Sequence, residues 1–200
     1  MGESVVSVII AILSYLIGSI PFAYIVGRLV KGVDIRKVGD GNVGGANAFR
    51  EIGAAAGLFV IVADIMKGVT VVLIAQGAHL NQTSVFVAGF ASVLGHIYPV
   101  FLNFRGGRGE ATAAGVLVVL LPVPMLTLLA IGLIPVILTR NTMILGAILF
   151  APLWLGAILT GASLGLIIYT TILPALVGIQ HLVTTKNLAT ETRRRSKYLR

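Results

Sequence analysis

The sequence DIRKVGDGNVGGANAFR, residues 34–50, is a polar, glycine-rich interruption between two long apolar runs. Arg36, Lys37 and Arg50 place positive charge within it. Glycine lets backbone N–H groups turn toward a ligand, and successive N–H groups in such a loop form a concave site for an anion. We therefore predict that this loop lies against a membrane and binds phosphate. A plain connector between membrane helices is the alternative interpretation.

The composition is that of an integral membrane protein. Of 200 residues, 57% are hydrophobic and 11% are charged, and the mean hydropathy is +1.01, whereas soluble domains carry about 25% charged residues. The absence of cysteine excludes disulfides and thiolate metal sites. His79, His96 and His181 lie far apart without metal-ligand spacing. We therefore expect neither a metal nor another cofactor.

Two sequence features are also typical of proteins that bind nucleic acids or nucleotides. The net charge is +8, but the positive residues are grouped in loops between apolar runs and in the tail, so we expect no nucleic-acid partner. The string Gly39-x-Gly41-x-x-Gly44 matches the dinucleotide fingerprint, which requires a preceding strand within a βαβ unit. Here an apolar run of membrane length precedes it, which excludes a Rossmann site.

Seven apolar segments follow one another along the chain. We predict an all-α fold of seven transmembrane helices in a single integral membrane domain, residues 1–200. The expected spans are residues 5–30, 53–74, 85–102, 112–121, 125–138, 143–159 and 164–182. Pro21 is expected to kink the first span, and the two prolines of LPVP, residues 121–124, are expected to form a turn between the fourth and fifth spans.

The distribution of lysine and arginine orients these spans. With the amino terminus outside, the inner side receives both glycine-rich loops, the Arg140 turn and the basic tail, residues 184–200. Every lysine and arginine apart from Lys67 then lies on that side or at its border, which satisfies the positive-inside rule. We therefore predict a cytoplasmic carboxy terminus, with the basic tail contacting anionic lipids.

A second polar loop, RGGRGE at residues 105–110, opens directly into the apolar segment that starts near Ala111. Helix N-termini attract anions through their free N–H groups and the helix dipole. Because Arg105 and Arg108 add two positive charges there, this loop is a second candidate phosphate site. The alternative of an RNA-binding RGG segment requires repeats in a disordered region, whereas this is a single copy between two spans.

Asp64 and Lys67 are charged residues inside the second expected span. Their spacing of three places them on one helix face, where they can pair. A charge at mid-membrane is costly and normally faces the bundle interior with a partner. We predict an ion pair, which is either purely structural or supports the substrate site.

Three motifs together resemble one family. DIRKVGxGNxGxxNxxR at residues 34–50, DxxKG at 64–68 and GHxxPxFxxFxGGxG at 95–109 are similar to the bacterial membrane acyl-phosphate:glycerol-3-phosphate acyltransferase family. The order of spans and loops and the basic tail also fit it. The resemblance implies transfer of an acyl group from acyl phosphate to the first hydroxyl of glycerol 3-phosphate, giving lysophosphatidic acid and phosphate. It also implies a bacterial cytoplasmic (inner) membrane location, with the active-site loops facing the cytoplasm.

The family resemblance and the loop chemistry assign roles to individual residues. Both substrates carry phosphate, so we expect two anion sites, one in each glycine-rich loop, with acyl phosphate, glycerol 3-phosphate and membrane lipids as partners. The expected catalytic residues are His96, Arg108 and Arg50. The expected substrate-binding residues are Asp40, Gly41, Asn42, Gly44, Asn47, Arg105, Gly106, Gly107, Gly109, Thr112, His181 and Asn187.

The chain departs from the family's usual pattern at several positions. Asp40 replaces a serine, Val43 replaces a proline, and Gly45-Ala46 replaces an alanine-threonine pair. Arg108 replaces a lysine, Glu110 replaces a small apolar residue, and Met143 and Gly146 replace serines. His181 and Asn187 are six residues apart, whereas the family has a histidine and an asparagine one helical turn apart. Asp40 either repels a phosphate or pairs with Arg105, Arg108 or Arg36.

Acyl phosphate is an activated donor, so positioning and stabilisation of the developing oxyanion can suffice, and we expect direct attack by the glycerol hydroxyl. His96 is either a general base or a residue that orients the loop by hydrogen bonding, and the same alternatives apply to His181. The acyl chain is expected in an apolar groove between helices, with Pro99, Phe101 and Phe104 as candidate lining residues.

Two other functions stay open at this point. Polar groups within a membrane also suit a transporter or channel for a small anion. A family paralogue with altered or lost activity is the second alternative, and Asp40 is the residue that favours it.

Overall fold

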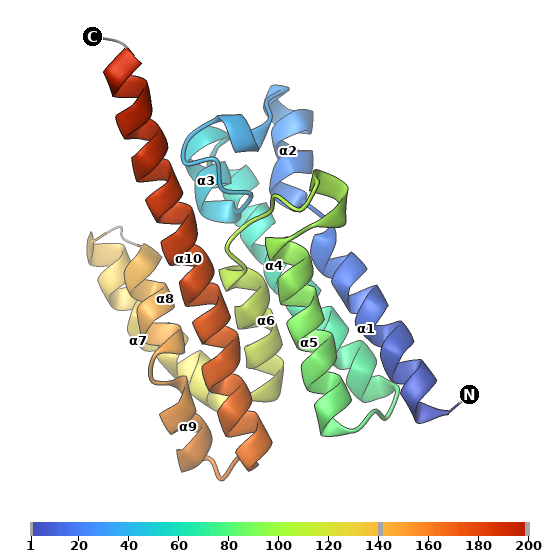
Figure 1. Cartoon of the computed structure of the whole chain (residues 1–200). Coiled ribbons are helices and arrows are strands. Elements are labelled where there is room, and N and C mark those ends of the chain that lie inside the picture. The colour runs from blue at the N-terminus through green and yellow to red at the C-terminus, as the bar shows by residue number, and fades with distance from the viewer. Residues whose placement is uncertain (1, 140–141, 199–200) are drawn as a thin grey trace.

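The computed structural model describes residues 2–139 and 142–198, with side chains left out at 136, 142–143 and 186–198. Within these ranges the chain is helical and contains no strand (Figure 1). The elements are α1 (Glu3–Ser19), α2 (Phe22–Lys31), η1 (Ile35–Lys37), α3 (Gly45–Glu51), α4 (Ala54–Gly77), α5 (Gln82–Ile97), η2 (Val100–Leu102), α6 (Glu110–Leu120), α7 (Pro122–Thr139), α8 (Thr142–Phe150), α9 (Leu153–Leu159) and α10 (Leu164–Tyr198).

Several of these helices have the length and composition of membrane spans. In the described residues five helical segments are long and apolar enough to cross a membrane: Glu3–Lys31, Ala54–Gly77, Gln82–Leu102, Pro122–Thr139 and Leu164–Thr185. Two further apolar helices are shorter, Glu110–Leu120 and Ile144–Leu159. Many large apolar side chains on the outer faces are exposed, as expected for contact with lipid. The predicted all-α membrane fold is confirmed, whereas the count of seven spans stays a prediction.

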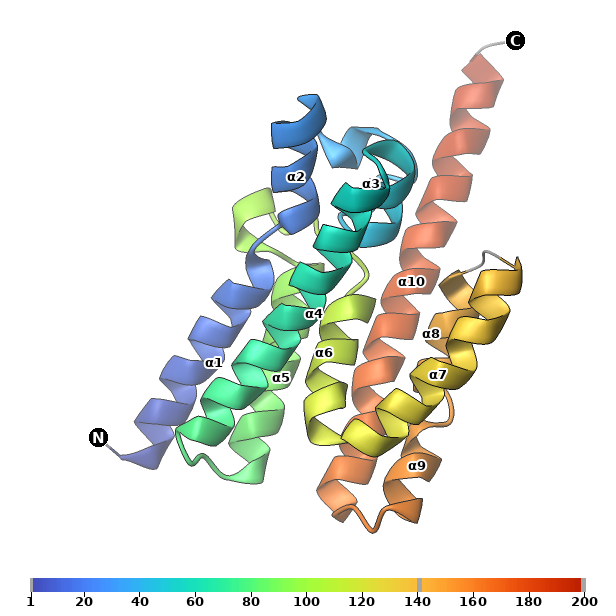
Figure 2. The same ribbon diagram turned by 180° about the vertical axis from the view of Figure 1, so that it is seen from behind.

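Proline residues interrupt the helices at three places. Pro21 separates α1 from α2, which confirms the predicted kink. The chain reverses direction between α6 and α7, beginning at Pro122, as expected for the LPVP segment (Figures 1 and 2). Pro152 separates α8 from α9, a break that we did not expect within the predicted span 143–159. Proline lacks the N–H that a continuous helix needs, so a helix interior is broken or bent there.

The two glycine-rich loops lie at the same end of the bundle. Figure 1 shows α2, η1 and α3 beside the segment that joins α5 to α6, at the end opposite the amino terminus. The long helix α10 reaches this same end and carries the carboxy terminus beyond it. The sequence predicted that both loops face one compartment, and their placement at one end agrees with that prediction.

Small residues allow the central helices to approach closely. A Cβ atom at Gly18 of α1 would collide with the backbone of Ser92 on α5, and one at Gly68 of α4 would collide with the backbone of Thr112 on α6. Small residues at helix contacts are a common means of packing inside membranes. The main apolar core joins α1 and α4 to the helices from α5 to α10, and a smaller core with Ile35 and Val43 underlies the first glycine-rich loop.

A buried cluster of charged side chains lies between α4 and α5. Lys67 Nζ is 2.8 Å from Asp64 Oδ1, and both side chains are 3% exposed, which confirms the predicted ion pair. Lys67 also donates to the carbonyl of Gly18, at 3.2 Å, and lies 5.0 Å from the ring centre of Phe22. His96 Nδ1 is 3.5 Å from Asp64 Oδ1. The pair therefore fastens α4 to α1 and α5 just beneath the second loop.

Candidate active site at the two glycine-rich loops

Asp34 and Arg36 fix the start of the first loop. Asp34 Oδ1 accepts hydrogen bonds from the backbone N–H and the Nε of Arg36, at 3.1 and 3.0 Å, and Oδ2 accepts from Nη2 at 2.8 Å. Arg28 lies 3.8 Å from the same carboxylate. The hydrogen bonds from Arg36 outweigh the effect of burial and lower the pKa of Asp34 from 3.8 to about 2. This arginine therefore holds the loop in place and already has an anionic partner.

Asn47 holds the first loop together from inside. Its side chain is fully buried. The amide Nδ2 donates to the carbonyls of Ile35, Val38 and Asn42, at 3.1–3.3 Å, and Oδ1 accepts from the N–H of Asp40. These contacts use the side chain within the loop, so the structure supports a positioning role for Asn47.

Two glycines permit the tight path of the first loop. Gly39 and Gly41 have positive φ angles, +59° and +66°, which favour glycine over other residues. A Cβ atom at Gly39 would also collide with the Asn47 amide oxygen. The glycines therefore give the loop its shape, and the N–H of Gly41 is used within it, donating to the carbonyl of Val38.

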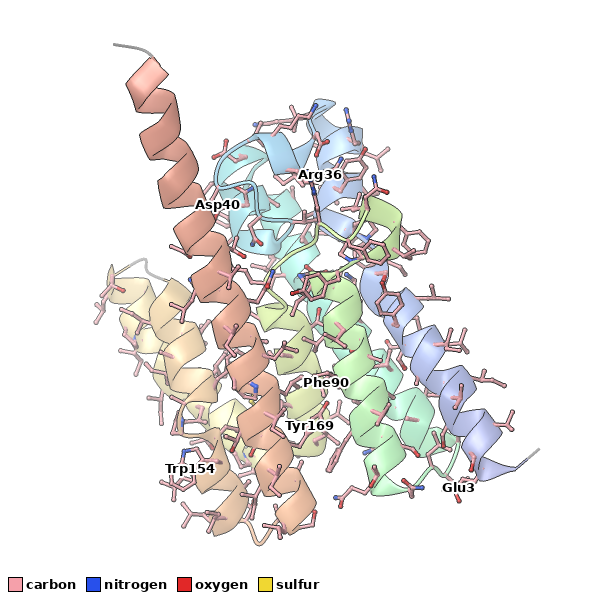
Figure 3. The ribbon with its side chains drawn as sticks, viewed as in Figure 1. Glu3, Arg36, Asp40, Phe90, Trp154 and Tyr169 are labelled. Carbon is pink, nitrogen blue, oxygen red and sulfur yellow. The ribbon has the colours of Figure 1, made fainter. Side chains whose placement is uncertain are left out.

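Asp40 lies where the two loops meet (Figure 3). Its Oδ2 atom is 2.9 Å from Nη2 of Arg50 in α3 and 3.5 Å from Nη2 of Arg108 in the second loop. Its Oδ1 atom accepts a hydrogen bond from the N–H of Asn42. Of the three partners expected for this carboxylate, Arg108 is found, Arg36 pairs with Asp34 instead, and Arg105 makes no contact with it among the described residues. Arg50 is an additional partner that we did not expect. Two guanidinium groups thus converge on one carboxylate oxygen.

The second loop is fastened to the end of α5. The N–H groups of Gly106 and Gly107 donate to the carbonyls of Ile97 and His96, both at 3.1 Å. A Cβ atom at Gly107 would collide with Nε2 of His96. His96 is buried behind the loop and faces Asp64 on its other side. These contacts support the interpretation that His96 orients the loop. The N–H groups of Gly106 and Gly107, two residues expected to bind substrate, are used to anchor the loop to α5.

Several buried polar atoms around the loops lack a hydrogen-bond partner among the described residues. They are Asn42 Oδ1, Arg108 Nε, Thr112 Oγ1 and His181 Nε2. Buried polar groups are normally satisfied, so these atoms are candidate contacts for a polar ligand. Arg105 and Arg50 are exposed near them, so the arginines offer positive charge that an anion can reach.

A cavity of about 590 Å³ extends beside this region, between α8, α9 and α10. Its walls include the apolar residues Phe150, Trp154 and Pro174, and Glu110 and His181 also line it. Trp154 is seen in Figure 3 toward the end of the bundle away from Asp40. The residues expected to line the acyl groove do not border this cavity. Phe101 in η2 and Phe104 just after it are exposed, and Pro99 lines a small cavity beside His96.

Nearly all the expected site residues lie at this end of the molecule. The loops bring together Asp40, Gly41, Asn42, Gly44, Asn47, Arg50, Arg105, Gly106, Gly107, Arg108, Gly109 and Thr112. His181 joins them from α10 through Glu110, which is 2.7 Å away. Asn187 lies in α10, and its side chain is outside the described residues, as is Arg140. Among the described residues, no group of three or more His, Cys, Asp or Glu could hold a metal ion.

The fold and the site together define a helical integral membrane protein with a cationic site formed by two glycine-rich loops. Comparison with known proteins gives its family. A family model described as glycerol-3-phosphate acyltransferase matches residues 8–191. Glycerol-3-phosphate acyltransferase 4 of Dehalococcoides mccartyi is 42% identical over 175 residues, 88% of this chain and 95% of that protein. The glycerol-3-phosphate acyltransferase of Bacillus subtilis is 44% identical over 132 residues, 66% and 68% of the two chains.

Solved structures agree with this assignment. The crystal structure of PlsY, an integral membrane glycerol 3-phosphate acyltransferase, in its glycerol 3-phosphate form has a TM-score of 0.82 and 33% identity, covering 92% of both chains. The lysophosphatidic acid form has a TM-score of 0.80 and 32% identity over the same shares. The chain belongs to the glycerol-3-phosphate acyltransferase family, as its motifs predicted. This membership sets aside the alternative of a transporter or channel.

Proposed function

We propose that this protein transfers an acyl group from acyl phosphate to the first hydroxyl of glycerol 3-phosphate, giving lysophosphatidic acid and inorganic phosphate. The observation that carries the proposal is the convergence of Arg50 and Arg108, from two different loops, on the single oxygen Oδ2 of Asp40. An arrangement that holds one carboxylate oxygen between two guanidinium groups has the charge and the donors to hold a phosphate oxygen. Family membership supports the same reaction.

The phosphate groups of the two substrates fit different parts of this site. Arg50 is 51% exposed and Arg105 is exposed as well, so both can reach a ligand from solution. Arg108 is 15% exposed, with its Nε buried and unpaired. Asn42 contributes a buried amide oxygen without a partner, which suits a hydroxyl group of glycerol better than a phosphate. These groups bind and orient the two anions against each other.

The reaction needs little covalent assistance from the protein. The glycerol hydroxyl attacks the acyl carbonyl carbon, the bond from that carbon to the phosphate oxygen breaks, and the hydroxyl proton ends on the departing phosphate. Holding both reactants in the right geometry supplies much of the rate enhancement. Arg105 and Arg108 lie beside the start of α6, where positive charge stabilises the developing oxyanion and the leaving phosphate. His96 keeps the second loop in place from behind.

The acyl chain occupies the cavity between α8, α9 and α10. Thr170 and Leu182 both line it, and helical geometry separates them by about 18 Å along α10. The apolar walls suit an alkyl chain. Glu110 directly follows the second loop in sequence, and His181 of α10 contacts it. Both line the cavity, so the carbonyl end of the chain points toward the loops.

The protein resides in the bacterial cytoplasmic (inner) membrane, with both glycine-rich loops in the cytoplasm. The support for this orientation is the concentration of lysine and arginine in those loops and in the tail, residues 184–200. Acyl phosphate would reach the cavity from the membrane, while glycerol 3-phosphate would reach the loops from the cytoplasm. The basic tail would contact anionic lipid headgroups.

A comparison of acyl donors tests the proposal. Purified protein in detergent is mixed with glycerol 3-phosphate and one donor: palmitoyl phosphate, palmitoyl coenzyme A or palmitoyl acyl-carrier protein. We expect lysophosphatidic acid only with palmitoyl phosphate. Formation of lysophosphatidic acid from palmitoyl coenzyme A or palmitoyl acyl-carrier protein would contradict the proposal that acyl phosphate is the donor. Absence of product with all three donors, from protein that unfolds cooperatively on heating, would contradict the acylation itself.

A further inference from the structure

Trp154 lies at the end of the acyl cavity that is farther from the two loops. The cavity has a volume of about 590 Å³ and follows α10 from Leu182, near the loops, to Thr170. In the described residues, Trp154 is the last residue of α9 and Thr170 the first residue of α10 that line it. Figure 3 shows Trp154 toward the end of the bundle away from Asp40. Trp154 and Thr170 therefore mark the floor of the cavity.

The turn that joins α9 to α10, residues 160–163, places the two floor residues at the same level. By helical rise, Trp154 lies about 8 Å before the end of α9, and Thr170 lies about 9 Å after the start of α10. Between the floor and this turn, Ala157 of α9 and Leu166 of α10 belong to the main apolar core and are 0% and 8% exposed. Packed side chains therefore fill the space beyond the floor, so the cavity ends there.

The floor offers an apolar surface. The hydroxyl of Thr170 donates to the carbonyl of Ile167 at 2.8 Å, and the hydroxyl of Thr171 donates to the same carbonyl at 3.3 Å. Both hydroxyl protons are thus used within α10. Trp154 adds a large, mostly apolar ring to the cavity wall. A floor built from these groups suits the terminal methyl group of an alkyl chain.

The length of the cavity corresponds to a particular length of acyl chain. Thr170 and Leu182 lie about 18 Å apart along α10. A fully extended chain of single bonds advances about 1.2 Å per bond, because the three main-chain bonds of an extended residue span about 3.5 Å. About 15 bonds therefore fit between the loop end of the cavity and its floor, which corresponds to about 16 carbon atoms. A longer chain would press against Trp154.

We propose that Trp154 closes the acyl cavity and sets an upper limit of about 16 carbon atoms on the acyl group that this protein transfers; this inference rests on the proposed function. A donor with more carbon atoms requires either a bent chain or displacement of the indole ring. Extra methylene groups forced into a filled apolar site lower an equilibrium constant about 5- to 150-fold. The limit selects among donors and leaves the chemistry at the loops unchanged.

The test is a competition between acyl phosphates that differ only in chain length. Purified protein in detergent receives glycerol 3-phosphate with equal amounts of palmitoyl and stearoyl phosphate, and mass spectrometry measures the ratio of the two lysophosphatidic acids. This ratio does not depend on how much of a variant folds, and the donors partition into detergent equally for every variant. We expect wild type to favour palmitoyl by about fivefold or more, and Trp154→Ala to reduce this preference by about fivefold or more.

Two further variants accompany Trp154→Ala. Leu155→Ala is the matched control, because Leu155 is 45% exposed and Trp154 is 46% exposed, and it should keep the wild-type ratio. Ala175 lines the cavity about 8 Å closer to the loops than Thr170. Ala175→Phe should therefore shorten the cavity and make lauroyl phosphate a better donor than palmitoyl phosphate.

The outcomes separate this inference from the function on which it rests. A product ratio in Trp154→Ala that stays at the wild-type value overturns the limit, as does equal use of palmitoyl and stearoyl phosphate by the wild type, which leaves the acyl transfer itself intact. An equal loss of turnover with every donor in Trp154→Ala also overturns it, and assigns the ring to packing at the membrane interface, where tryptophan is common. If the folded wild-type protein makes lysophosphatidic acid from no acyl phosphate, the proposed function fails, and the limit fails with it.

Discussion

At the residue scale, Asp40 is the position where this chain differs most consequentially from the family pattern that it otherwise follows. A carboxylate lies where an anionic substrate would be expected to bind. In the structure it does not repel its surroundings, because Arg50 and Arg108 both contact Oδ2. A phosphate that approaches these arginines must therefore share them with Asp40 or displace it.

Asp40→Ser should tighten the binding of phosphate. Removal of the carboxylate frees both guanidinium groups and removes a like charge, so we expect the inhibition constant of inorganic phosphate to fall about tenfold. The measurement is inhibition of the acyl transfer by added phosphate. Glu3→Gln, which removes the same charge at the opposite end of the bundle, should leave the inhibition constant unchanged. An unchanged or higher constant in Asp40→Ser would show that Asp40 does not compete with phosphate.

At the element scale, the shape of the first loop depends on interactions that close it on itself. The Asp34–Arg36 pair fixes its start, and Asn47 joins three of its carbonyl groups. The short helix α3 then carries Arg50 to the meeting point with the second loop. The positive side chains are therefore aimed by the fold of the loop.

The lowered pKa of Asp34 should appear as a pH dependence of stability. The folded-state pKa is about 2, whereas the unfolded carboxyl titrates near 3.9. Because the folded-state pKa is lowered, the contribution is complete above about pH 4 and is lost as pH falls toward 2. Melting temperatures of wild type and Asp34→Asn should thus differ by a constant amount above about pH 5 and converge only as the pH falls to about 2. A difference that does not change between pH 5 and pH 2 would contradict this origin of the stability.

The second loop depends on the space left by Gly107. A Cβ atom there would collide with the His96 ring and would lie 2.7 Å from the carbonyl of Val43. We expect Gly107→Ala to displace the loop and lower kcat at least tenfold while the protein still folds, because a displacement of about 1 Å in a catalytic group can cost 10²-fold. Gly77→Ala, where nothing lies within 4 Å, is the matched control. Wild-type kcat in Gly107→Ala would show that the loop tolerates the shift.

The hydropathy pattern was enough to predict the helical segments, but it did not predict the local structure of the loops and helix breaks. The apolar runs predicted the helical segments, and the prolines at 21 and 122–124 predicted a kink and a turn that the structure contains. The sequence did not predict α3 within the polar loop, because this short helix depends on packing against α4. The break at Pro152 was also not predicted, although a proline inside an apolar run is a signal for it. It also did not predict that Asp40 meets Arg50 or that Glu110 meets His181. Those contacts span 10 and 71 residues and exist only in the assembled fold.

At the scale of the whole molecule, the structure places both glycine-rich loops at the end opposite the amino terminus. This arrangement gives the site two approaches. One is the cavity between α8, α9 and α10, whose walls are largely apolar. The other is the exposed cationic surface at Arg50 and Arg105. A protein that joins a lipid-soluble donor to a water-soluble acceptor needs such a pair of approaches.

The predicted orientation can be tested with single cysteines, since the natural chain contains none. We expect Lys37→Cys, in the first loop, to react with a membrane-impermeant maleimide only after the cells are opened. Thr83→Cys, at the other end of the bundle, should react in intact cells. The wild-type chain serves as the unlabelled control. Labelling of Lys37→Cys in intact cells would reverse the orientation and place the site outside.

The central claim is that Arg50 and Arg108, one from each side of the meeting point of the two loops, together hold the phosphate groups of acyl phosphate and glycerol 3-phosphate while the two substrates react. The most direct test is to follow inorganic phosphate and lysophosphatidic acid together, with palmitoyl phosphate as donor, in wild type, Arg50→Ala and Arg108→Ala. We predict that the wild-type protein releases the two products in equal amounts and only when glycerol 3-phosphate is present, and that each variant loses at least tenfold in kcat/KM. Phosphate release without glycerol 3-phosphate, or variants with wild-type kcat/KM, would contradict the account.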